Sequence, residues 1–175
     1  MVLVRLAAGP VGRARRRATE LSRERLRIAA GLQPGPGLVA YEAGEPVGWV
    51  SVAPRAAFPG IAGGDADPDD GIWSISCFVV HRNARRRGVA RALLDAAIAY
   101  ARERGARTIE GYPVEVEGPK GSAQLWTGVR SMFDAAGFEE RGRFEQWSAV
   151  PAATGPHPRK VGRPPGRPVM RLDLG

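Results

Sequence analysis

The chain has 175 residues, 43% of them hydrophobic, with one cysteine and a formal net charge of +8. This length predicts a single domain over residues 1–175, and the hydrophobic share excludes wholesale disorder. Cys77 alone excludes an internal disulfide and a multi-cysteine zinc site, so we expect no metal. No apolar run approaches the roughly 20 residues of a membrane span, and residues 1–6 are too short for a signal peptide. We therefore expect a cytoplasmic protein with no membrane partner.

The positive charge is concentrated at the two ends of the chain. Residues 1–31 hold eight arginines and two glutamates, and residues 151–175 hold five basic residues and one aspartate. The residues between these segments carry a net charge of −2. Because the middle of the chain is slightly acidic, we do not expect it to bind polyanions in general, and nucleic acid is not an expected partner.

Periodicity and the placement of glycine and proline predict the elements of the first half. Residues 12–31 predict a helix with a basic outer face. Leu38–Glu42 and Pro46–Ala53 predict a β-hairpin around a Gly44-Glu45 turn. Residues 54–71 are rich in proline, glycine and aspartate, which indicates a long loop of the kind that often binds or covers a ligand.

Strands and helices alternate in the second half. The predicted strands are Ile72–Val80, Thr108–Val114, Phe138–Trp147 and a short closing strand at Val169–Leu174. The predicted helices are Gly88–Arg104 and Ser122–Ala136, and residues 149–168 form a Pro/Gly-rich irregular segment. A hairpin followed by this alternation predicts an α/β fold in which helices cover a mixed sheet.

The junction between the strand Ile72–Val80 and the next helix combines positive charge with a helix start. Arg85-Arg86-Arg87 run directly into Gly88-Val89-Ala90. A helix N-terminus presents unpaired N–H groups and the positive end of the helix dipole, and small residues let a phosphate approach them. Arginines beside it would add charge-assisted hydrogen bonds. The pattern favours a diphosphate site, and the alternative is an ordinary helix start with solvated arginines.

Arg85-x-x-Gly88-x-Ala90 resembles the acetyl-CoA motif Arg/Gln-x-x-Gly-x-Gly/Ala of the GNAT N-acetyltransferases. The run from Phe133 to Phe138 is similar to the family's aromatic-x-x-x-Gly-Phe, and the resemblance covers residues 37–147. It implies an α/β fold of the α+β type, with a mixed, mostly antiparallel central sheet flanked by helices. It also implies acetyl-CoA as co-substrate and a small-molecule amine as acceptor, which attacks the thioester in a ternary complex. The family is often dimeric, which makes a homodimer an expectation of the resemblance.

The resemblance implies a way of holding the cofactor. Pantetheine would add along Phe78-Val79-Val80 like an extra β-strand, and the pyrophosphate would lie on the amides at the start of the helix. Amides around Phe78 and Val79 would stabilise the oxyanion. Arg82, Arg85 and Arg86 are candidates for the 3′-phosphate. The implied cofactor-binding residues are Phe78, Val79, Val80, Arg85, Arg86, Arg87, Gly88, Val89, Ala90 and Arg91.

The family's usual catalytic side chains are replaced in this chain. The position of the tyrosine general acid holds Phe133, and the asparagine that often contacts the cofactor is replaced by Trp126. The candidates that remain are Glu115 as a general base, Tyr112 as a hydroxyl donor, and Ser131 beside the vacant tyrosine position. Each also has an ordinary structural interpretation, and catalysis by positioning and water is the alternative.

Four further interpretations stay open. The basic ends favour a protein- or nucleic-acid-directed acetyltransferase or binding module, and Phe133 favours a catalytically silent CoA-binding sensor. Trp49, Trp73, Trp126 and Phe58 would form an aromatic acceptor pocket if they converge. Cys77 would allow an acyl-cysteine route, although a lone cysteine on a buried strand is more often a small hydrophobic residue.

Overall fold

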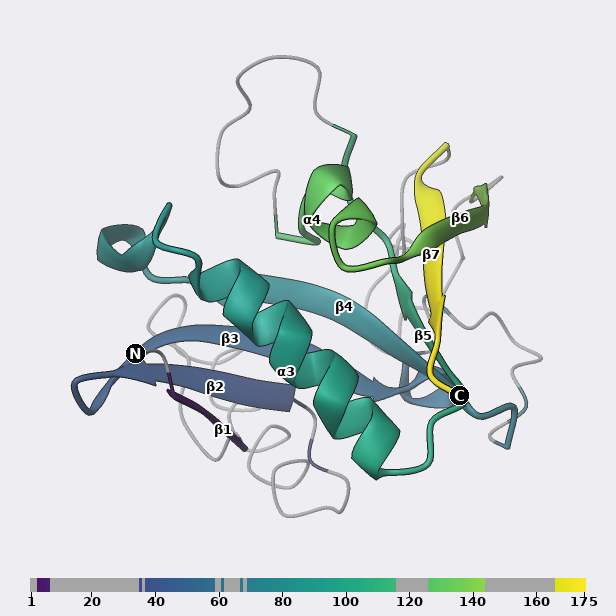
Figure 1. Ribbon diagram of the computed structural model, residues 1–175, viewed down its shortest axis with the longest axis horizontal. Helices are drawn as coiled ribbons and strands as arrows, with labels where there is room; N and C mark the ends of the chain where they lie inside the picture. Colours follow the sequence, from purple (N-terminus) through teal and green to yellow (C-terminus); the bar gives the residue numbers. More distant parts are fainter. Residues whose placement is uncertain are drawn as a thin grey trace, which may run out of the picture.

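The computed structural model describes residues 3–6, 35, 37–58, 61, 67, 69–115, 126–143 and 166–175. These residues form a seven-stranded sheet in the order β1-β2-β3-β4-β5-β7-β6 (Figure 1). The strands are β1 (Leu3–Leu6), β2 (Gly37–Glu42), β3 (Glu45–Pro54), β4 (Ile72–Val80), β5 (Thr108–Gly111), β6 (Glu139–Arg143) and β7 (Pro168–Asp173). The helices are α3 (Val89–Glu103) and α4 (Arg130–Asp134), with 3-10 turns η1 (Arg55–Ala57) and η2 (Arg82–Ala84).

The predicted mixed, mostly antiparallel sheet flanked by helices is confirmed. Among the strand pairs of the described residues, β4 with β5 is the parallel one and the others are antiparallel. In Figure 1, α3 crosses the face of β2, β3 and β4, and α4 lies near β5 and β6. No described helix is long and apolar enough to cross a membrane.

Helix α3 is amphipathic and supplies much of the core. Val89, Leu93, Ala97 and Tyr100 form its buried apolar face. The ring of Tyr100 packs edge-on against Trp73 of β4, with 5.6 Å between the ring centroids. The helix is thereby fixed against the middle of the sheet, and its N-terminus lies at the end of the loop that follows β4.

Strand β4 contains a bulge that opens the sheet. Ser51 of β3 pairs with Cys77 and Val52 pairs with Ile75, so Ser76 is an extra residue on β4. Strand β5 pairs with β4 only as far as Ile75. Beyond the bulge the pairing of the two parallel strands ends, and the Phe78 N–H of β4 donates to the carbonyl of Trp126 instead.

Two predicted elements are shorter than expected. The predicted strand Thr108–Val114 ends at Gly111, because Pro113 has no N–H for the ladder; Val114 forms only an isolated bridge with Val129. The predicted helix Ser122–Ala136 is helical only over Arg130–Asp134 within its described part. The other predicted strands are confirmed within one or two residues where they are described. Residues 12–31, 122–125, 144–147 and 149–165 lie outside the described residues.

Candidate functional site

The loop between β4 and α3 has an open backbone at the helix start. Gly88 caps the N-terminus of α3 with a φ of 80°, and an added Cβ there would meet no heavy atom within 4 Å. Arg86 also has a positive φ, of 61°. Turns of this kind direct successive backbone N–H groups toward a common anion, and the first N–H groups of α3 have no partner inside the helix. The loop therefore provides an open, positively polarised cradle.

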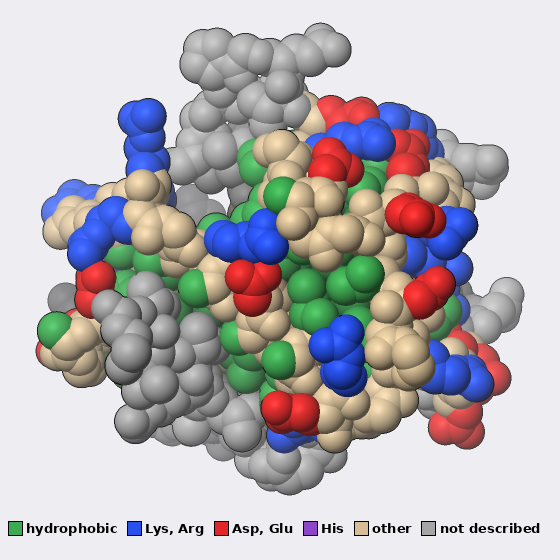
Figure 2. Space-filling view, in the orientation of Figure 1, with side chains coloured by type: hydrophobic (Ala, Val, Ile, Leu, Met, Phe, Trp, Pro, Cys, Tyr) green, Lys and Arg blue, Asp and Glu red, His purple; other side chains and the backbone are tan. Residues whose placement is uncertain are grey.

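The arginines around this cradle divide into two groups. Arg87 pairs with Glu42 at 2.6 Å, and Arg91 pairs with Asp95 at 2.9 Å, so these two charges are balanced by neighbours. Arg82 and Arg86 are exposed and form no ion pair within the described part of the chain. In Figure 2, basic side chains stand together at the end of the molecule where α3 begins. Arg82 and Arg86 are thus the side chains best placed for an added phosphate.

The edge of β4 beyond its pairing with β5 runs from the cradle toward the bulge. Val79 is 47% exposed, whereas Phe78 is buried. The Phe78 N–H donates to the carbonyl of Trp126 at 2.5 Å, and the Val80 carbonyl accepts from Arg85 Nε at 3.2 Å. The Phe78 amide, which the resemblance placed near a thioester, is therefore engaged by Trp126 in this structure.

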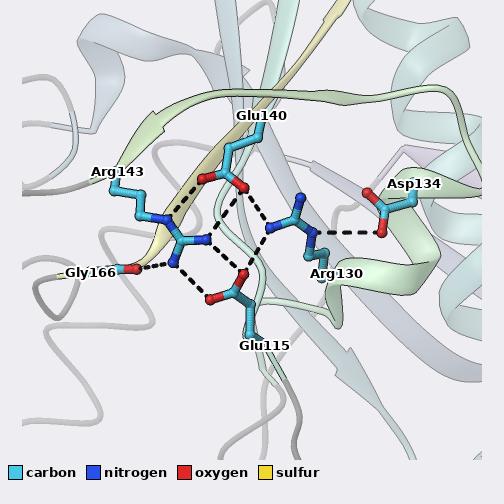
Figure 3. A network of polar contacts seen from close by, with 6 residues as sticks. All are labelled: Glu115, Arg130, Asp134, Glu140, Arg143 and Gly166. Atoms are coloured by element: carbon cyan, nitrogen blue, oxygen red, sulfur yellow. Dashed lines mark hydrogen bonds and ion pairs between the residues drawn. The ribbon is translucent and has the colours of Figure 1, made fainter.

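Glu115 lies in a network of ion pairs on the surface (Figure 3). Its carboxylate accepts hydrogen bonds at 2.8 Å from both Arg143 and Arg130, and Glu140 contacts the same two arginines. Hydrogen bonds from Arg143 and Arg130 lower the pKa of Glu115 to about 2. A carboxylate with so low a pKa is a weak proton acceptor, so these contacts make Glu115 a poor general base.

Tyr112 lies in a second, buried network. Its hydroxyl donates to Glu110 Oε2 at 2.6 Å and contacts Ser74 Oγ at 2.8 Å. Glu110, only 2% exposed, also accepts from Arg171 Nε at 2.5 Å. Nothing in the sequence marks Glu110 or Arg171 as functional, apart from the presence of an acid inside an otherwise apolar strand. Tyr112 and Ser74 therefore help to stabilise a buried carboxylate.

Comparison with known proteins identifies the family of this chain. The model of the Acetyltransferase (GNAT) family matches residues 10–118. The chain belongs to the GNAT acetyltransferase family. A search of curated proteins gives no match.

Solved structures share the fold. A GNAT-family protein from Desulfovibrio desulfuricans is 16% identical, with both chains covered fully and a TM-score of 0.59. A GCN5-related N-acetyltransferase from Kribbella flavida is 22% identical, with 99% of this chain and 98% of that chain covered and a TM-score of 0.57. A protein from Salmonella typhimurium, solved with its cofactor acetyl-CoA, is 20% identical at a TM-score of 0.49; 79% of this chain matches 64% of that one.

The GNAT tyrosine position is part of the core in this protein. Phe133 is fully buried, and its ring packs edge-on against Phe138 at 5.0 Å and Phe78 at 6.3 Å between centroids. It has no polar atom, so it cannot donate a proton. Ser131, two residues earlier on α4, is exposed. The structure therefore places Ser131 at the surface and Phe133 in the core below it.

Two members of the predicted aromatic pocket lie in different surroundings. Trp73 is buried on the face of the sheet that packs against α3, whereas Trp126 is 42% exposed. Cys77 is half-buried, and its thiol contacts the carbonyl of Phe78 at 3.7 Å. Thr127, which the sequence analysis did not select, is buried beside Trp126.

The ionised state of Glu115 leads to a pH prediction. Its pKa falls from 4.5 to about 2 on folding, so its stabilising contribution is complete above about pH 4.5 and is lost between about pH 4.5 and 2. We expect Glu115→Gln to lower the melting temperature near pH 6, and this gap to shrink on acidification. Thermal unfolding of both proteins from about pH 6 to 3 measures it; a gap that does not change with pH would contradict the network.

Proposed function

We propose that this GNAT protein is an acetyl-CoA-dependent N-acetyltransferase that moves an acetyl group to a primary amine of a small molecule. The amine attacks the thioester directly within a ternary complex. The observation that carries the proposal is the open cradle at Gly88, because it joins the family's motif to a backbone that leaves room for a pyrophosphate. A cytoplasmic location and a homodimer belong to the same proposal; the first rests on the sequence and the second on the family resemblance.

The cradle and the edge of β4 beyond its pairing with β5 fit different parts of acetyl-CoA. The amides of Gly88, Val89 and Ala90 would hold the pyrophosphate, and Arg82 and Arg86 would hold further phosphate charge. The main-chain edge at Phe78–Val80 lies beyond the pairing with β5 and suits pantetheine, which can add to it as a strand does. Because the Phe78 N–H now donates to Trp126, its use by the thioester requires the carbonyl of Trp126 to move away.

Acetyl-CoA supplies the activated acetyl group, and the protein supplies mainly position. Phe133 cannot protonate the leaving thiolate, and Glu115 is held ionised by two arginines. Tyr112 and Ser131 remain candidates for a hydroxyl role. We infer that alignment of the amine and the thioester supplies most of the rate acceleration. Water takes the proton of the ammonium.

The cradle can be tested with a matched pair of variants. Gly88 and Gly105 flank α3 with φ values of 80° and 77°, and an added Cβ at either one meets no heavy atom within 4 Å. Gly88→Leu and Gly105→Leu therefore place a side chain in the same left-handed backbone, at a cost of about 1–2 kcal/mol each. Only Gly88→Leu also fills the space at the helix start.

We expect acetyl-CoA to raise the melting temperature of the wild type and of Gly105→Leu, but not that of Gly88→Leu. Thermal shift at millimolar acetyl-CoA measures this. If Gly88→Leu keeps the full shift, the cradle is assigned to the wrong place. If the wild type shows no shift, the acetyl-CoA proposal itself is wrong.

The second candidate function is a CoA-binding sensor without turnover. Phe133 favours it, because the family's proton donor is replaced by a buried hydrocarbon ring. A sensor would bind acetyl-CoA as strongly as an enzyme does and would release no thiol in the presence of any amine.

A further inference from the structure

Arg167 lies where the acceptor end of the site is built. It directly precedes β7, which pairs antiparallel with β5, so Arg167 lies at the carboxyl end of β5. Its guanidinium donates to the Thr127 hydroxyl and, at 3.3 Å, to the carbonyl of Tyr112. Both partners are neutral oxygens. Within the described residues the side chain therefore has two fixed contacts and no acidic partner.

Every neighbouring carboxylate of the described residues is already held by another arginine. Arg167 forms no ion pair within these residues, and burial lowers the pKa of its guanidinium. A partly buried charge without a counter-ion is costly, and an arginine stays charged in proteins. The nearby pairs are Glu110 with Arg171, and Glu115 and Glu140 with both Arg130 and Arg143.

A short chain of contacts connects Arg167 to Phe78 of β4. Thr127, which accepts from Arg167, follows Trp126 in the chain. The carbonyl of Trp126 accepts from the Phe78 N–H, the amide that the proposed function places near the thioester. One side-chain contact, one residue step and one main-chain hydrogen bond thus separate the guanidinium from that amide.

We propose that Arg167 binds the carboxylate of the acceptor, so that the small-molecule amine is an amino-carboxylic acid. This inference rests on the proposed function and names its substrate class. A guanidinium presents a planar fork of donors that matches a carboxylate, and within the described residues only Nη1 of Arg167 donates a hydrogen bond. Binding the acid group there would hold the amine of the same molecule close to the thioester, as positioning catalysis requires.

The test uses acceptor pairs that differ in one charge. Amino acids with one, two or three carbons between amine and carboxyl are each compared with their carboxamides, and thiol release from acetyl-CoA is measured. For the best acceptor we expect kcat/KM about 10- to 100-fold higher with the acid than with the carboxamide. Amidation also lowers the pKa of an α-amine, so more of the carboxamide is present as the neutral, reactive amine. This effect alone would make the carboxamide the better acceptor. A higher kcat/KM for the acid therefore indicates that the protein binds the carboxylate.

Variants then assign the preference to one side chain. Arg167→Gln should raise KM for the acid and bring the acid-to-carboxamide ratio of kcat/KM close to one, and Arg167→Lys should keep part of the preference. Arg141→Gln, on β6 and paired only with Glu139 within the described residues, is the control and should keep it.

The outcomes separate this inference from the function on which it rests. Equal transfer to every acid and carboxamide by the wild type would overturn the carboxylate site and leave the acetyltransferase standing. A preference that persists in Arg167→Gln would also overturn it. No thiol release with any acceptor would overturn both. Because the wild-type panel decides the first point, a variant that fails to fold does not affect it.

Discussion

Glu110→Ala should lower the free energy of unfolding by about 3 kcal/mol, because it breaks a buried ion pair from one side. Glu110 is 2% exposed and binds Arg171 Nε at 2.5 Å and the Tyr112 hydroxyl at 2.6 Å. Its removal takes this acceptor from Arg171 Nε and from the Tyr112 hydroxyl, which keeps its contact with Ser74 Oγ. The Arg171 side chain is 36% exposed and is partly rehydrated, which keeps the loss at the lower end for such pairs.

Denaturant unfolding of Glu110→Ala and of the control Glu139→Ala measures this effect. Glu139 is on the surface strand β6, and its side chain is 69% exposed where it pairs with Arg141. Exposed pairs contribute little, so we expect a change within about 0.5 kcal/mol for the control. Equal losses in the two variants would show that the Glu110 network does not stabilise the sheet.

Phe133→Ala should cost about 3–5 kcal/mol, because it empties a fully buried ring site. The ring contacts Phe78 and Phe138 and covers Gly111 so closely that a Cβ there would lie 2.0 Å from it. Denaturant unfolding measures the loss, and a loss below about 1 kcal/mol would contradict the packing.

Gly111→Ala gives an independent check on that contact. The added methyl overlaps the Phe133 ring, so Gly111→Ala alone should destabilise by about 1–3 kcal/mol. In Phe133→Ala the ring is gone, and the same methyl then has room. We expect the double variant to be more stable than the sum of the single losses, and additivity would show that the two residues do not touch.

Local pattern was enough to predict the elements that frame the site. Ile72–Val80 forms a strand with the predicted bounds, and the predicted helix Gly88–Arg104 differs only by its caps. Both carry a strong local signal: a β-branched, aromatic run in one, and 3.6-residue periodicity ending at Gly105 in the other. The loop between them follows directly, which is why the cradle could be located from the sequence.

Long-range contacts decided what the sequence could not predict. Three consecutive arginines are equivalent in the sequence, but Arg87 meets Glu42 of the distant β2, and Arg86 meets no described acid. From the sequence, Glu115 is one candidate for a general base, and an ordinary solvated glutamate is the alternative. Arg130 and Arg143 lie 15 and 28 residues away from it along the chain, and only the folded sheet brings them together.

Burial of Glu110 was unpredictable for the same reason. An isolated acid in Thr108–Gly111 is normally a solvent-facing residue of a half-buried strand. Its partner Arg171 comes from β7, 61 residues later in the chain. The position of Trp126 in front of the Phe78 amide likewise depends on the separation of β4 and β5 beyond the bulge.

Thiol release from acetyl-CoA by the wild-type protein, measured across a panel of primary amines, tests the central claim most directly. We expect thiol release above the rate without enzyme for at least one amine. The acetylated amine should form in an amount equal to the released thiol. The contradicting result is that acetyl-CoA binds and raises the melting temperature but gives no thiol and no acetylated product with any amine. That result would contradict the acetyltransferase activity and support the CoA-binding sensor.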